Sequence, residues 1–115
     1  MEDKLIELLE SLGVEVHRQG SLAENKPYPE TFFTYWENDS YDLKHYDNKT
    51  FSVADAYTIY IYSKRPKTAY DLLTSAIALL KENGWIVSGR GYDVDSGTET
   101  HTGRAIDITY LSCNV

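Results

Sequence analysis

Side chains that can ligate a metal ion alternate along one segment near the end of the chain. The candidate ligands are Asp93, Asp95, Glu99 and His101, with Gly97 between them. Carboxylate oxygens and imidazole nitrogens suit Ca²⁺ or a transition metal. The segment departs from an EF-hand loop, because its glycine comes one position early and no glutamate closes the loop. We therefore expect a solvated hairpin tip here, with no metal and no other cofactor.

Residues that serve in catalysis elsewhere do not occur in catalytic patterns here. His17, His45 and His101 form neither a His-x-His nor a His-Glu-x-x-His pair. Cys113 has no histidine near it in sequence and is expected to be an inert thiol. Residues 89–91 (GRG) lack the further glycines, the lysine and the following helix of phosphate-binding loops. The sequence predicts no catalytic residue and a protein that is not an enzyme.

Composition limits the classes of protein to consider. A chain of 115 residues with 42% hydrophobic and 25% charged residues fits one soluble domain. The lone cysteine, the acidic start of the chain and the lack of a long apolar run favour a protein kept inside a cell, away from membranes. The net charge of −7 argues against specific binding of nucleic acid. The basic cluster Lys64, Arg65 and Lys67 is best interpreted as a solvated turn.

The strongest periodic pattern lies at residues 68–85 and predicts an amphipathic helix. Thr68 with Asp71 fits a capping box, and Gly84 followed by Trp85 fits a Schellman-type end. The apolar stripe of this helix comprises Ala69, Leu72, Leu73, Ala76, Ile77 and Leu80. Such a stripe has to pack on another element, and a sheet is the expected support.

The remaining patterns predict a second helix and five strands. Residues 1–12 carry leucines at helical spacing, and Gly13 marks the expected end of this helix. Strand patterns occur at 14–18, 30–37, 51–63, 85–92 and 104–112. The polar segment 38–50 is expected to be an exposed connection. The order α-β-β-β-α-β-β predicts one α+β domain, residues 1–115, with a mainly antiparallel sheet and two helices packed on one face.

The chain is rich in aromatic residues, with ten Tyr, three Phe and two Trp. If the helices cover the isoleucine side of the sheet, we expect other side chains to face outward and form an interface with a partner protein. The expected interface residues are Tyr35, Tyr60, Tyr62 and Leu111. The alternative is that a loop of the same chain, or the first helix, covers this face.

Several segments together resemble a known family. These are an amino-terminal helix ending in Leu-Gly-Val, the aromatic stretch PYPETFFTYWEND, the passage AYTIYIYSKRPKTAYDLLTSAIALLKENGW and the final RAIDITYL. In order and texture they resemble the tail-terminator or head–tail joining (tail-completion) proteins of siphophages and of prophages of Gram-positive bacteria. The resemblance covers nearly the whole chain and involves no diagnostic motif.

The resemblance implies a structural, non-enzymatic role in virion assembly. It implies α+β subunits that associate into a ring, often a hexamer, and that contact tail-tube and head-connector proteins. The protein would then act in the host cell cytoplasm during assembly and remain in the virion. Ring closure uses a heterologous contact, in which one patch of a subunit meets a different patch of its neighbour.

Two alternative hypotheses assign the protein to different functional classes. A small-ligand-binding or enzymatic α+β domain predicts an enclosed pocket between sheet and helices, lined by Trp36, Tyr57, Trp85 and Tyr110. An antitoxin-like or regulatory adaptor is compatible with the acidic charge. Gene neighbours encoding a portal, a capsid and a tail protein would favour the assembly role over both.

Overall fold

The computed structural model describes residues 2–18, 29–44, 51–95 and 100–114, which form two helices and five strands. The elements are α1 (Glu2–Glu10), β1 (Glu15–Arg18), β2 (Thr31–Lys44), β3 (Phe51–Ser63), α2 (Pro66–Glu82), β4 (Ile86–Val94) and β5 (Thr102–Asn114). The predicted α+β class and the order α-β-β-β-α-β-β are confirmed.

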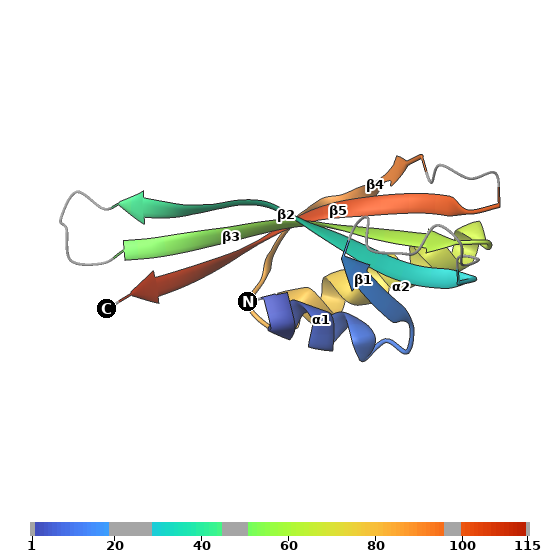
Figure 1. The fold of residues 1–115 in the computed structure, drawn as a ribbon, viewed down its shortest axis with the longest axis horizontal. Coiled ribbons are helices and arrows are strands. Elements are labelled where there is room, and N and C mark those ends of the chain that lie inside the picture. The colour runs from blue at the N-terminus through green and yellow to red at the C-terminus, as the bar shows by residue number, and fades with distance from the viewer. Residues whose placement is uncertain (1, 19–28, 45–50, 96–99, 115) are drawn as a thin grey trace.

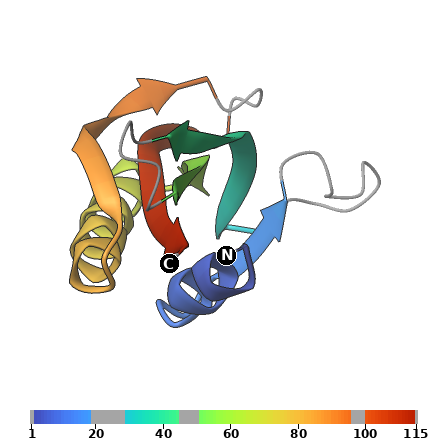
Figure 2. The ribbon, with the colours of Figure 1, turned by 90° about the vertical axis from the view of Figure 1, so that its left-hand side faces the viewer.

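The five strands form one mixed sheet in the order β1-β2-β3-β5-β4. The pairing of β1 with β2 is parallel, and the other three pairings are antiparallel. Figures 1 and 2 show both helices on the same side of this strongly twisted sheet. The sheet therefore has a core face, beneath the helices, and an outer face on the opposite side.

Helix α2 begins three residues earlier than its capping pattern predicts. Arg65 is the N-cap without a side-chain hydrogen bond, and Pro66 occupies the first turn. The predicted capping box of Thr68 and Asp71 is wrong, because the fixed φ of proline already suits the first helical position. The predicted end is confirmed, since the Trp85 amide donates to the Leu80 carbonyl at 3.0 Å.

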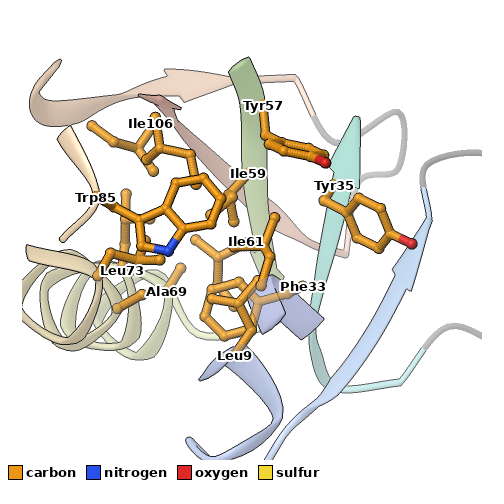
Figure 3. Packing of buried hydrophobic residues seen from close by; sticks show 14 residues of the cluster. Leu9, Phe33, Tyr35, Tyr57, Ile59, Ile61, Ala69, Leu73, Trp85 and Ile106 are labelled. Carbon is orange, nitrogen blue, oxygen red and sulfur yellow. The ribbon is translucent and has the colours of Figure 1, made fainter. Parts of the chain in front are cut away.

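The core lies between the two helices and the core face of the sheet (Figure 3). Leu5 and Leu9 of α1 are fully buried, so the leucine stripe predicted for the first helix packs into the same core as α2. The other buried members of this cluster are Phe33, Tyr35, Tyr57, Ile59, Ile61, Ala69, Leu73, Ala76, Leu80, Trp85, Ile106 and Ile108. Their burial supplies the main stabilising free energy of the fold.

Strand β2 continues well past residue 37, so the prediction of an exposed connection at 38–44 is wrong. A bulge between Glu37 and Asp39 shifts the register, and β2 then pairs with β3 as far as Lys44 opposite Phe51. Cross-strand pairing overrides the polar composition of this segment. Residues 45–50 of the predicted connection lie outside the described residues.

Parts of β2, β3 and β5 extend beyond the helices as a three-stranded blade (Figure 1). We define the blade as residues 39–44, 51–56 and 109–114, which pair in the order β2-β3-β5. The extents of 52 × 27 × 23 Å reflect this projection. The radius of gyration is 15.4 Å, whereas a compact chain of this length has about 13 Å.

Candidate protein interface on the outer face of the sheet

Strand alternation and register determine which side chains occupy the outer face. Tyr60 of β3 lies opposite Thr34 of β2 and Ala105 of β5, and Tyr92 of β4 also lies opposite Ala105. One step along the sheet, Thr58 lies between Trp36 and Asp107. Because paired residues share a face, side chains from four strands meet on one surface.

Several large side chains on this surface are left about half exposed. The exposed fractions are 47% for Trp36, 46% for Tyr92, 52% for Ile86 and 44% for Leu111. We use the name open face for the surface formed by Trp36, Thr58, Tyr60, Ile86, Tyr92, Asp107 and Leu111. A surface that joins several large apolar groups is typical of a binding site.

Two of the four predicted interface residues belong to the open face. Tyr60 is partly exposed, and Leu111 pairs with Ala54 on the same side of the sheet. Tyr62 also points to the outer face but is only 8% exposed. Its ring packs on Phe32 at 5.3 Å between centroids and stacks with Tyr60 at 6.2 Å. Tyr62 thus supports the ring of Tyr60 more than it offers a contact surface.

The prediction that Tyr35 faces outward is wrong. Tyr35 pairs with Ile59 on the core face and is 5% exposed. Its hydroxyl points toward β1 (Figure 3) and shares hydrogen bonds with Glu2 and Arg18. Glu2 and Arg18 also form an ion pair of 2.7 Å. Tyr35 therefore ties β2 to α1 and β1 within the fold.

A row of hydrogen bonds crosses the open face from β2 to β4. Asn38 Nδ2 donates to Thr58 Oγ1 at 2.7 Å, and Thr58 Oγ1 donates to Asp107 Oδ1 at 2.7 Å. The Tyr92 hydroxyl lies 3.3 Å from both carboxylate oxygens of Asp107. The row orients the carboxylate in the middle of the aromatic surface and holds four strands in register.

The same contacts change the acidity of Tyr92. Burial raises the pKa of its hydroxyl above the ordinary value of 10.0, and the charge of Asp107 and the hydrogen bond to it raise the pKa further. The Tyr92 hydroxyl therefore stays protonated near neutral pH and can donate a hydrogen bond to Asp107.

Sequence reasoning missed most of this surface. The strand patterns did not reveal that Asp107 and Tyr92 lie on the same face as Trp36. The bulge at Glu37 brings Asn38 into the row, and a second irregularity between Ser88 and Tyr92 sets the position of Tyr92. Pairing across strands far apart in sequence carried this information, and no local pattern encoded it.

The pocket proposed as an alternative site does not form from its four residues. Tyr57 and Trp85 are buried in the core with ring centroids 6.0 Å apart, and Tyr110 packs on Trp85 at 5.2 Å. Trp36 lies on the outer face of the sheet, away from them. A shallow groove of about 520 Å³ borders Trp85 and Tyr110 between α1 and the end of α2.

The described part of the former metal candidate makes other contacts. Asp93 accepts from Arg104 Nη1 at 2.6 Å, and His101 Nε2 lies 2.9 Å from the Pro29 carbonyl oxygen. Gly97 and Glu99, like His45, lie outside the described residues. Among the described residues, no three His, Cys, Asp or Glu side chains gather as a metal site. Within the same ranges, no helix is long and apolar enough to span a membrane.

Comparison with known proteins adds no family to this geometry. No protein-family model matches the chain, and a search of curated proteins finds no match to it.

Proposed function

We propose that the protein is a structural subunit of phage or prophage assembly, either a tail terminator or a head–tail joining protein. It acts through contacts with other copies of itself in a ring and with tail-tube and head-connector proteins. The observation that carries the proposal is the open face, because both helices pack on the other side of the sheet and leave its aromatic side chains half exposed. Burial of such a surface by a partner removes apolar groups from water and therefore stabilises the complex.

The blade supports the same role. Among the described residues, β1 pairs with β2 only as far as Tyr35, and β4 pairs with β5 only as far as Thr109. Both outer strands of the blade therefore present backbone groups that no described strand pairs. Free strand edges are places where another chain adds on, and assembly proteins use them for that purpose.

The proposal is tested by the mass of the protein in solution as its concentration rises. We expect the wild type to form a discrete oligomer, visible as a ring by electron microscopy. Trp36→Ser and Tyr92→Ser should each weaken association by about thirtyfold or more, because aromatic anchors dominate interfaces. Lys67→Ser, at an exposed position at the start of α2, is the control.

Association of both open-face variants at the wild-type concentration would contradict the proposal. A wild-type protein that stays monomeric at every concentration would contradict it as well.

A further inference from the structure

The charge of Asp107 restricts what can cover the open face. Asp107 is exposed and lies among Trp36, Tyr60 and Tyr92, where it accepts hydrogen bonds from Thr58 and Tyr92. A partner that buries this surface removes water from the carboxylate, which is costly unless the partner supplies a positive charge. This step rests on the proposed function, in which the open face is an interface.

The same charge disfavours contact between two open faces. In a symmetric face-to-face dimer, the Asp107 carboxylates of both copies would be buried in one interface. Like charges brought together across an interface repel each other and weaken binding. The neighbour must therefore present a different surface, and that surface must carry a cation.

The chain has a surface with this chemistry on the helix side of the sheet. A hollow of about 450 Å³ lies between α2 and the irregular part of β4. Arg90 and Lys81 supply positive charge, and Tyr70 is 52% exposed beside them. The remaining lining residues are Thr74, Ile77, Ala78 and Gly89. Apolar groups and two cations thus match the aromatic groups and single carboxylate of the open face.

Glycines shape this hollow. Gly89 and Gly91 flank Arg90 and have φ values of 78° and 95°, which favour glycine. A Cβ atom at Gly91 would lie 2.6 Å from Leu73 Cδ2 of α2. The backbone of β4 therefore runs directly against α2 at Gly91 and places Arg90 at the rim.

We propose that the open face of one copy docks on this hollow of the next copy, with Asp107 paired to Arg90 and Lys81 close by. The two surfaces lie on opposite sides of the sheet, so each subunit uses one surface for each neighbour. A contact of this kind is head-to-tail, and it closes into a ring when the rotation between subunits permits.

Reversing charges on the two surfaces tests the pairing. Asp107→Arg and Arg90→Asp should each raise the dissociation constant for self-association by about thirtyfold or more at low salt. The double variant Asp107→Arg/Arg90→Asp should regain much of the wild-type affinity. An equimolar mixture of the two single variants should also associate, because every contact in an alternating ring then joins an arginine to an aspartate. Asp3→Arg and Lys67→Asp are exposed controls of matched charge.

The outcomes separate this pairing from the proposed function. If Arg90→Asp associates like the wild type while Trp36→Ser does not, the pairing is overturned and the interface stands. If Asp107→Arg binds wild-type protein more tightly than the wild type binds itself, the contact is face-to-face and the pairing is overturned. Normal thermal unfolding of Arg90→Asp, whose side chain is exposed, excludes misfolding as the cause of lost association. A strictly monomeric wild type overturns both proposals.

Discussion

Two tyrosines on the core face, Tyr35 and Tyr57, make different contacts within the fold. Tyr35 reaches the edge of the sheet, where Glu2 and Arg18 satisfy its hydroxyl. Tyr57 is 3% exposed, with its ring against Trp85. Neither residue can contact a partner without rearrangement of the core, so both contribute to stability.

Replacing Tyr35 separates stability from assembly. Tyr35→Phe removes the hydrogen bonds to Glu2 and Arg18 and should lower the free energy of unfolding by about 0.5–1.5 kcal/mol. The loss stays modest because Glu2 and Arg18 still pair with each other. Urea denaturation measures it, with Tyr70→Phe on an exposed ring as the control. We expect the self-association of Tyr35→Phe to be unchanged. Weaker self-association of this variant would mean that Tyr35 contributes to the interface.

The ionisation of Tyr57 makes stability fall at alkaline pH. Burial, and to a lesser extent the nearby carboxylates of Glu37 and Asp55, raise the pKa of Tyr57 from 10.0 to about 12. The unfolded state therefore loses this proton first, so the stabilisation is complete below pH 10 and is lost as pH rises toward 12. The slope from this residue is at most about 1.4 kcal/mol per pH unit.

Unfolding of Tyr57→Phe at pH values above 10 measures this contribution. The variant should show a shallower loss of stability with pH than the wild type, because phenylalanine has no proton to lose. Identical slopes for the two proteins would mean that Tyr57 ionises equally easily in the folded and unfolded states.

At the scale of elements, the glycines of β4 show how a strand is fitted to a helix. Gly89 and Gly91 both have positive φ, but their surroundings differ. A Cβ at Gly89 meets nothing within 4 Å, whereas a Cβ at Gly91 meets Leu73 Cδ2 at 2.6 Å and the Ala105 carbonyl oxygen at 2.9 Å. Only Gly91 is required both for its conformation and for its lack of a side chain.

Paired alanine substitutions test this difference. Gly89→Ala should cost about 1 kcal/mol, from backbone conformation alone. Gly91→Ala adds a steric conflict with α2 and β5 and should cost about 2–4 kcal/mol. Chemical denaturation of both variants gives the comparison. Equal losses at the two positions would contradict the close approach of β4 to α2.

The sequence predicts the elements of this fold better than their contacts. Apolar periodicity identifies both helices, and Gly84 with Trp85 marks the end of α2 correctly. The start of α2 was missed because Pro66 outweighs the polar pair that follows it. The length of β2 was missed because pairing with β3 stabilises a polar segment that has weak strand propensity of its own.

The candidate site was less predictable than the fold. Tyr60 and Leu111 were assigned to the open face from alternation within their own strands. Tyr35 was placed on the wrong face because its position depends on the register with Ile59. The place of Asp107 on the open face follows only from the pairing of β3, β4 and β5, and the sequence alone does not give it. A one-residue change of register would move Asp107 to the other face.

At the scale of the whole molecule, net charge opposes association while the open face favours it. Each copy carries a formal charge of −7, so copies repel one another at low ionic strength. Salt screens this repulsion over a Debye length of about 10 Å at 0.1 M and about 3 Å at 1 M. Apolar contacts on the open face, and an ion pair buried beneath them, are screened much less.

Self-association should therefore strengthen severalfold as sodium chloride rises from about 0.02 M to about 0.5 M. Sedimentation at fixed protein concentration measures this change. A triple variant tests the same idea by reducing the net negative charge from −7 to −4. Its substitutions are Glu7→Gln, Glu10→Gln and Glu82→Gln, all at exposed helix positions. It should associate more tightly at low salt and respond less to added salt. Association that weakens with salt would instead mean that exposed charge pairs hold the copies together. That result would contradict the proposal that the open face is the interface.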